Sequence, residues 1–327
     1  MISFNPKEPD SITLVTTFRC NASCERCCFG CRPDFGRTMT IEQMKRYVDI
    51  SLEAYPNFIK YLSLTGGECF LLGKDLDGII SFGKEKGLRV GLISNGYWGY
   101  NYKEAVKRIN GLKELGLAEI SFTCGDEHNH LIPFRSVRNA VVASARAGFK
   151  VEFRTENGYY NGIRAYIEKD AVLQRLIENK KITRVSQMFV DFNNEKTYRR
   201  HPESRYRYPE KSKPCRSLCH SITISPYGDV MACCGIGMFR IPQLRLGNIE
   251  TEPIKTIFNR IFQDALKIWL HTGGPIEIFQ YLYDKSDISF RTWGEACRFC
   301  KEIFSNPEII PFLKEHYEDW IEKIHYY

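Results

Sequence analysis

The stretch Ile12-Thr-Leu-Val-Thr-Thr-Phe18-Arg-Cys20-Asn-Ala-Ser-Cys24-Glu-Arg-Cys27 joins a short apolar run directly to three closely spaced cysteines. The apolar run is rich in β-branched residues and predicts a buried strand. Three thiolates on one tight loop can hold three irons of a [4Fe–4S] cube, which leaves the fourth iron without a protein ligand. Zinc is the alternative, because Cys28 or Cys31 could supply a fourth thiolate. The spacing assigns no other role to these two extra cysteines.

Five further runs of the same kind follow, and amphipathic stretches separate them. We expect strands at Ile12–Phe18, Tyr61–Leu64, Leu88–Ile93, Ala118–Phe122, Phe149–Phe153 and Ile182–Val190. A capping-box pattern over Thr40–Gln43 starts the first helix, and Gly87, Gly116 and Gly148 stand where later helices should stop. Six strand–helix units predict an α/β fold with a parallel sheet, and we favour a partial (β/α)₆ barrel of the TIM type over an open doubly wound sheet.

The sequence divides into three segments by composition. Residues 1–190 carry the barrel pattern, and residues 215–327 form a smaller cysteine-bearing domain that ends in a helix over Phe312–Ile324. Between them, residues 191–214 contain seven basic residues and three tyrosines. Such a mixture can bind nucleic acid. Glu195, Glu203 and Glu210 interrupt the basic run, however, so we expect a solvated linker and no nucleic-acid partner.

The overall composition is that of a soluble globular protein. The chain has 327 residues, of which 43% are hydrophobic and 26% charged, and this excludes disordered and fibrous classes. The apolar runs fall short of the roughly 18 residues of a membrane helix, and the first residues lack a signal-peptide pattern. The thirteen cysteines, an odd number, fall into two groups. We therefore expect a cytoplasmic protein with no membrane partner and with two metal centres, because disulfides are rare in that compartment.

The first cysteine group and its surroundings resemble the radical SAM superfamily. Leu64-Thr65-Gly66-Gly67-Glu68, at the end of the second strand, is similar to the family's Gly-Gly-Glu motif. The resemblance implies that Cys20, Cys24 and Cys27 hold a [4Fe–4S] cluster whose open iron binds S-adenosylmethionine, which is cleaved reductively to a 5′-deoxyadenosyl radical. It also implies a set of cofactor-binding residues at the strand ends. These are Gly66, Gly67 and Glu68 toward the amino group, Ser94 and Asn95 toward the ribose, Thr123 with a hydroxyl, and Arg154 toward the carboxylate.

The second cysteine group resembles the auxiliary-cluster domains called twitch and SPASM. The segment 222–233 reads as a hairpin, with Pro226–Asp229 as its turn and Cys233 at its end. The resemblance implies that Cys215, Cys233, Cys297 and Cys300 hold a second [4Fe–4S] cluster. Cys219 could replace Cys215, since its distance from Gly228 nearly fits the same spacing, and a zinc site is the simpler alternative.

Cys234 follows the predicted ligand Cys233 directly. Adjacent residues of a strand point to opposite faces, so Cys234 should point away from the second cluster. Most unligated cysteines are small buried hydrophobes. The sharper hypothesis is that Cys234 is a catalytic hydrogen donor.

The resemblance favours the modification of a ribosomally made precursor peptide, with Cα epimerisation from L to D as first choice. That reaction needs a thiol near the substrate, which Cys234 could supply. Alternatives are a cross-linking maturase that forms thioether or carbon–carbon bonds, a radical dehydrogenase of a small alcohol, and, outside enzymes, a zinc protein that binds RNA. We expect a flavodoxin- or ferredoxin-type electron donor. Because only 19 residues precede Cys20, we expect no separate leader-binding domain before it.

Overall fold

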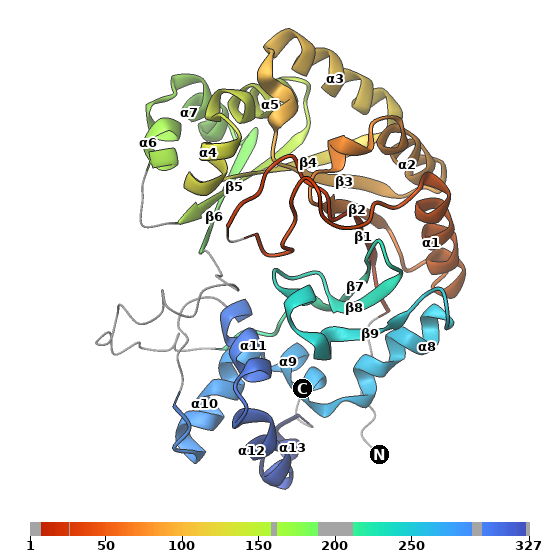
Figure 1. The fold of residues 1–327 in the computed structure, drawn as a ribbon, viewed down its shortest axis with the longest axis vertical. Helices are drawn as coiled ribbons and strands as arrows, with labels where there is room; N and C mark the ends of the chain where they lie inside the picture. Colours follow the sequence, from red (N-terminus) through yellow and green to blue (C-terminus); the bar gives the residue numbers. More distant parts are fainter. Residues whose placement is uncertain (1–7, 26, 158–161, 189–211, 290–295, 325–327) are drawn as a thin grey trace. The chain divides into compact units, whose positions relative to one another are not determined.

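The computed structural model describes residues 8–25, 27–157, 162–188, 212–289 and 296–324 (Figure 1). It separates into two compact units. Residues 10–189 form the first, with 224–227 counted to it, and most of the remaining chain forms the second. The predicted linker at 191–214 lies almost wholly outside the described residues.

The first unit is built on six parallel strands. They are β1 (Ser11–Thr17), β2 (Tyr61–Gly66), β3 (Arg89–Ser94), β4 (Leu117–Cys124), β5 (Lys150–Asn157) and β6 (Ile182–Met188). Their spatial order is their order in the sequence, from β1 to β6. Right-handed crossovers that always step in one direction put every helix on the same face. The sheet therefore follows the barrel arrangement, whereas a doubly wound sheet would reverse its order, and the predicted fold class is confirmed.

Helices cover the outer face of this sheet (Figure 1). They are α1 (Ile41–Ala54), α2 (Lys74–Glu85), α3 (Tyr102–Leu115), α4 (Asp126–Leu131), α5 (Phe134–Arg146), α6 (Gly162–Lys169) and α7 (Ala171–Glu178), with 3₁₀ turns η1 (Cys69–Leu72) and η2 (Tyr97–Tyr100). The capping box at Thr40 and Gln43 is formed in both directions. Gly87, Gly116 and Gly148 all have positive φ, at 75°, 105° and 87°, as their predicted places after helices require.

The register brings the carboxyl ends of these strands to one edge. Thr17 lies opposite Gly66, and Thr123 lies opposite Arg154. The loops after β1, β2 and β3 therefore start from neighbouring strand ends. In a barrel of this kind, this edge carries the functional residues.

The second unit contains three strands and a helical region. The strands β7 (Leu218–Ile224), β8 (Asp229–Cys233) and β9 (Arg245–Asn248) lie side by side in that order. A turn at residues 226–227 joins β7 to β8, as the sequence predicts for the hairpin. The remaining elements are η4 (Met238–Arg240), η5 (Pro242–Leu244), α8 (Ile254–Asn259), η6 (Arg260–Gln263), α9 (Ala265–Thr272), α10 (Pro275–Lys285), α11 (Ala296–Ser305), α12 (Ile309–Glu315) and α13 (Tyr317–Ile324).

The single helix expected over Phe312–Ile324 is wrong in one respect: the chain forms two helices, α12 and α13, with a break at His316. The break allows the side chain of Trp320 to be buried. Its indole N–H donates to the Leu313 carbonyl at 2.7 Å, and its ring stacks on Trp269 at 4.9 Å between centroids. The change of direction buries this side chain, which is 3% exposed.

Within the described residues, the structure has no helix that is both long and apolar enough to span a membrane.

Candidate active site and metal centres

The cysteine loop after β1 is closed by backbone hydrogen bonds to its own return segment. The Cys20 amide donates to the Arg32 carbonyl at 3.2 Å, and Arg19 and Arg32 form a parallel bridge. Gly30, with φ at 68°, turns the chain, and its amide donates to the Cys27 carbonyl at 3.0 Å. The loop from residue 20 to 31 is thus a closed unit anchored to the end of β1.

The structure places the sulfurs of Cys20, Cys24 and Cys27 within electrostatic reach of one another. Burial raises the pKa of Cys20 from 9.0 to about 11, and Glu68, Cys24 and Cys27 add to that rise. The Ala22 amide opposes it by donating to the Cys20 sulfur at 3.4 Å. Three sulfur ligands on one loop, with a backbone N–H donor to one of them, fit an iron–sulfur cluster. Burial disfavours the charged thiolate, but iron binds the thiolate form and so drives the loss of the proton.

Cys27 is surrounded by donors from the end of the same loop. The Cys31 amide donates to its sulfur at 3.3 Å, and the thiols of Cys28 and Cys31 also hydrogen-bond to it. These bonds lower the pKa of Cys27. The same hydrogen bond, together with burial, raises the pKa of Cys31, whose side chain is 3% exposed. Cys31 therefore lies against the sulfur of Cys27, with its backbone amide as a donor.

The Gly66–Gly67 pair lets the end of β2 approach the cysteine loop. A Cβ on Gly67 would lie 2.0 Å from the Arg19 carbonyl oxygen and 3.1 Å from the Cβ of Cys20. The Gly67 amide donates to the Thr17 carbonyl at 2.7 Å, and the Glu68 amide donates to the Arg19 carbonyl at 3.0 Å. The glycines therefore fix the position of Cys20, in addition to any contact with a cofactor.

The Glu68 carboxylate is wholly buried, and groups of the chain itself bind both of its oxygens. One oxygen accepts from the Phe70 amide at 3.1 Å and from the Ser94 hydroxyl at 2.9 Å. The other accepts from the Asn95 amide at 2.7 Å. Burial raises the pKa of Glu68 from 4.5 to about 7, against the effect of these three donors. Its expected contact with the amino group of the cofactor remains a prediction. The observed role of Glu68 is to link the end of β2 to the end of β3 through hydrogen bonds with Ser94 and Asn95.

Ser94 and Asn95 extend this network toward the cysteine loop. The Ser94 hydroxyl donates to Glu68 and accepts from the Gly96 amide and from the indole of Trp98, at 3.0 and 3.1 Å. The Asn95 side-chain amide donates to Asn21 at 2.9 Å and lies 3.7 Å from the Cys20 sulfur. Sequence reasoning missed Asn21 and Trp98, because neither belongs to a motif and only the packing of loops from different strands brings them to the site.

Thr123 and Arg154 are register partners on β4 and β5, and both are partly buried. The Arg154 guanidinium is bound by Glu152, which stands two residues earlier on the same face of β5, at 2.8 and 2.6 Å. The Ser121 hydroxyl donates to the same Glu152 oxygen at 2.9 Å. Glu152 therefore holds the orientation of Arg154, and no sequence motif had singled it out. The carboxylate-binding role of Arg154 stays a prediction.

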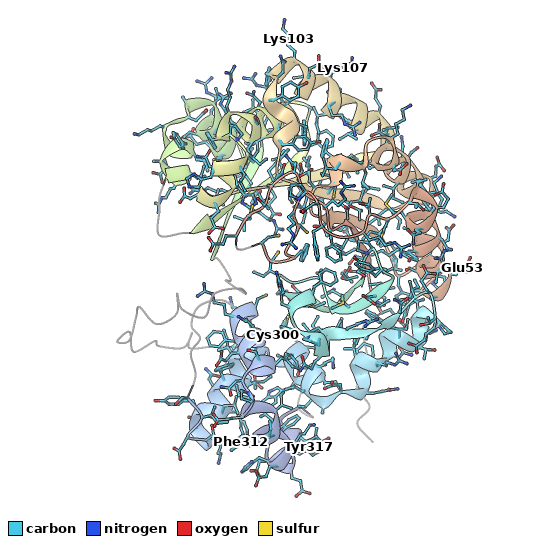
Figure 2. All side chains as sticks on the ribbon, viewed as in Figure 1. Glu53, Lys103, Lys107, Cys300, Phe312 and Tyr317 are labelled. Carbon is cyan, nitrogen blue, oxygen red and sulfur yellow. The ribbon has the colours of Figure 1, made fainter. Side chains whose placement is uncertain are left out.

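In the second unit, the four predicted cluster ligands affect one another's pKa values. The sulfurs of Cys233 and Cys297 lie 3.7 and 3.6 Å from the position that a Cβ on Gly235 would take. Burial raises the pKa of Cys233 well above 9.0, and Cys300, Cys215 and Cys297 contribute. The pKa of Cys300, on α11, is raised by burial and by Cys297 and Cys215 (Figure 2). This group fits four-thiolate ligation of one cluster.

Cys219 is the alternative ligand that the sequence leaves open. It is buried at 3% exposure with φ at 66°. Burial and the neighbouring Cys215 raise the pKa of Cys219, and Lys267 opposes that rise. The choice between Cys215 and Cys219 as the ligand stays a prediction.

Cys234 lies one residue beyond the end of β8. It is exposed, whereas Cys233 is buried. Its amide donates to the Ser217 carbonyl at 3.2 Å, and its thiol makes a long hydrogen bond of 3.9 Å to the same oxygen. The expected opposite orientation of the two neighbouring side chains stays a prediction, because Cys234 itself lies outside β8.

In the described part of the chain, no three His, Cys, Asp or Glu side chains converge closely enough to hold a single metal ion.

Two family models match this chain. Residues 14–160 match the Radical SAM superfamily, and residues 215–301 match SPASM, an iron–sulfur cluster-binding domain. The chain has a radical SAM domain followed by a SPASM domain. The radical SAM domain implies S-adenosylmethionine and a [4Fe–4S] cluster, and the SPASM domain implies further iron–sulfur ligation. The residues at both sites fit these groups, with Cys20, Cys24 and Cys27 at the first and the Cys233 group at the second.

The chain is similar to a curated protein along nearly its whole length. The putative peptide biosynthesis protein YydG of Bacillus subtilis (strain 168) is 22% identical over 328 residues, which cover 94% of this chain and 98% of that protein. Among solved structures, BtrN in complex with AdoMet and 2-DOIA is 16% identical, with 83% of this chain and 91% of that chain covered and a TM-score of 0.49. Streptococcus suis SuiB is 13% identical, with 88% and 77% covered and a TM-score of 0.49.

Proposed function

We propose that this radical SAM enzyme epimerises Cα centres, from L to D, in a ribosomally made peptide, and that Cys234 donates the hydrogen. The observation that carries the proposal is the position of Cys234: an exposed thiol directly follows a buried cysteine of the second cluster group. The name of the similar Bacillus subtilis protein, which refers to peptide biosynthesis, supports a peptide substrate.

The residues of the first unit would hold the cofactors. Cys20, Cys24 and Cys27 would bind the first cluster, while Gly66 and Gly67 bring the end of β2 against the start of the cysteine loop. The bound cluster and S-adenosylmethionine would supply a 5′-deoxyadenosyl radical able to abstract a hydrogen atom from Cα, with 5′-deoxyadenosine as the product.

Cys234 would complete the inversion. Its S–H bond breaks, the hydrogen atom joins the Cα radical on the face opposite the abstraction, and a thiyl radical remains on Cys234. One electron and one proton restore the thiol. The electron comes from a one-electron reductant of the flavodoxin or ferredoxin class. The long hydrogen bond from the thiol to the Ser217 carbonyl would orient it until the substrate arrives.

The test looks for a short open reading frame next to this gene, uses the peptide that it encodes as substrate, and analyses the product by chiral amino-acid analysis after acid hydrolysis. We expect D residues from the wild type and none from Cys234→Ala or Cys234→Ser. The serine variant is the matched control, because it keeps a hydroxyl near Ser217 but its O–H bond is too strong to quench a carbon radical. Cys124→Ala, at a buried cysteine in the first unit, should epimerise normally. Inversion by the Cys234 variants would refute the donor role, and loss of two hydrogens or formation of a ring would favour a dehydrogenase or a cross-linking enzyme.

A further inference from the structure

The side chain of Asn95 is buried, and polar groups of the chain itself surround it. Asn95 is 5% exposed. Its main-chain amide donates to Glu68 at 2.7 Å, and its side-chain oxygen accepts from the Tyr97 amide at 3.0 Å. Its side-chain nitrogen donates to the Asn21 oxygen at 2.9 Å and to the Cys20 sulfur at 3.7 Å. Both polar atoms of this side chain therefore have partners, and the nitrogen has two of them at the start of the cysteine loop.

The Tyr97 amide fixes the direction in which the Asn95 side chain faces. A backbone N–H can only donate, so the atom that faces it must be the side-chain oxygen, and the nitrogen must face the cysteine loop. That nitrogen carries two hydrogens. One is donated to Asn21 and the other to Cys20, so neither is left for an oxygen of a ribose.

These contacts join three loops that leave neighbouring strands. Cys20 and Asn21 belong to the loop after β1, Glu68 follows β2, and Asn95 follows β3. The Glu68 amide donates to the Arg19 carbonyl at 3.0 Å, so the residue that binds the Asn95 amide also binds the start of the cysteine loop. Asn95 is thereby fixed at its main chain and at its side chain, and Cys20, which is 8% exposed, lies against it.

A side-chain donor at the sulfur of a cluster ligand has two effects. It restricts the position of the sulfur, and it changes the reduction potential of the cluster, because hydrogen bonds to ligand sulfurs are among the factors that set this potential. A reduced cluster carries one more negative charge than an oxidised cluster. An N–H donor therefore stabilises the reduced state more than the oxidised state.

We propose that Asn95 is a positioning residue of the first cluster, which holds Cys20 in place through Asn21 and through a hydrogen bond to the Cys20 sulfur. This role differs from the ribose contact expected for Asn95. The inference applies to the cluster whatever peptide reaction the enzyme performs, so its test and the test of epimerisation can fail separately.

The test variant is Asn95→Leu. Leucine has a similar size and branching but no N–H donor in its side chain, and the main-chain amide can still reach Glu68. Asn139→Leu is the matched control. Asn139 is another buried asparagine of the first unit, 7% exposed, and its side-chain nitrogen donates to the Gly99 carbonyl at 3.0 Å rather than to the cysteine loop.

The first measurement needs no cluster. The full-length metal-free protein is alkylated with iodoacetamide, and fragmentation mass spectrometry gives the rate at Cys20 relative to that at Cys124, a fully buried cysteine of the same unit. In Asn95→Leu we expect this ratio to rise about tenfold, because opening of the loop no longer breaks the hydrogen bonds to Asn21 and Cys20. Asn139→Leu should leave the ratio unchanged. An unchanged ratio in Asn95→Leu would overturn the proposal.

The second measurement is an anaerobic redox titration of the reconstituted holoenzyme without S-adenosylmethionine, followed by EPR. The part of the signal that changes when S-adenosylmethionine is added afterwards identifies the first cluster. In Asn95→Leu we expect about a fivefold fall in the ratio of reduced to oxidised first cluster at a fixed potential, because one hydrogen bond to a ligand sulfur is lost. Fivefold corresponds to about 40 mV for a one-electron couple.

Asn139→Leu should titrate as the wild type does, and an equal shift in both variants would reduce the effect to a general loss of packing and overturn the proposal. Weaker S-adenosylmethionine binding by Asn95→Leu, with the potential and the alkylation ratio unchanged, would also overturn it and would return Asn95 to the ribose. If Asn95→Leu does not assemble the first cluster, the alkylation ratio still decides.

Discussion

The substitution Gly67→Ala tests whether the end of β2 positions the cluster loop. The added Cβ would lie 2.0 Å from the Arg19 carbonyl oxygen and 2.5 Å from its carbon, whereas real Cβ atoms essentially never come within 3.0 Å of a neighbour. The two segments must therefore separate by about 1 Å. Such a shift would lengthen the 3.0 Å hydrogen bond from the Glu68 amide to Arg19 beyond bonding distance.

The expected cost follows from these two effects. Overpacking in a tight site costs about 1–3 kcal/mol, and a lost backbone hydrogen bond adds about 1 kcal/mol. We expect the free energy of unfolding of the metal-free protein to fall by about 2–4 kcal/mol. Because Cys20 moves with Arg19, the rate of 5′-deoxyadenosine formation should fall about 100-fold, as a misplacement of about 1 Å can cause.

Gly111→Ala is the matched control. Gly111 lies within α3, and a Cβ there would have nothing within 4 Å. This variant should be more stable by about 1 kcal/mol and fully active. The assays are denaturant unfolding, iron and sulfide content after anaerobic reconstitution, and 5′-deoxyadenosine release with dithionite. A Gly67→Ala protein with wild-type stability, iron content and turnover would refute the reasoning.

Three other predictions follow from the described sites. Burial raises the pKa of Glu68 from 4.5 to about 7 in the folded protein. Between pH 4.5 and 7 the folded state therefore binds more protons than the unfolded state, so the free energy of unfolding falls as the pH rises through this range. In urea unfolding of the metal-free protein, the wild type should lose about 3 kcal/mol relative to Glu68→Gln between pH 4.5 and 7.5, and parallel pH profiles would contradict this. Cys215→Ala should retain about four irons per chain and Cys219→Ala about eight, since Cys215 is among the residues that raise the pKa of Cys233 and Cys300. The reverse order in an iron assay would reassign the ligand. Arg154→Lys should weaken S-adenosylmethionine binding about tenfold in equilibrium dialysis, because a lysine cannot form the bidentate contact, and unchanged binding would exclude Arg154 from the cofactor site.

The parts of this fold that the sequence predicts are those that depend on local patterns. The six strands are short apolar runs, and the first helix begins at a capping box that needs only Thr40 and Gln43. Glycines mark the ends of three helices, because the positive φ needed there is costly for other residues. The order of the strands then follows from right-handed connections, which are nearly invariant.

The parts that the sequence does not predict depend on contacts between distant residues. Glu68 reads as a ligand-binding residue in its motif, yet three donors from its own chain surround it, and one of them is Asn95, 27 residues away. Trp98 supports the same network through Ser94 without belonging to any motif. The break between α12 and α13 depends on the burial of Trp320 against Trp269, which periodicity along the tail does not reveal.

The most direct test of the proposed function is the mass of the product formed in D₂O. A thiol exchanges its proton with solvent, so a hydrogen that comes from Cys234 should appear as one deuterium at each inverted Cα. We expect a mass increase of one unit per D residue for the wild-type enzyme. A product that contains D residues but no deuterium would contradict the account, because the returned hydrogen would then have come from a non-exchangeable position and not from the thiol of Cys234.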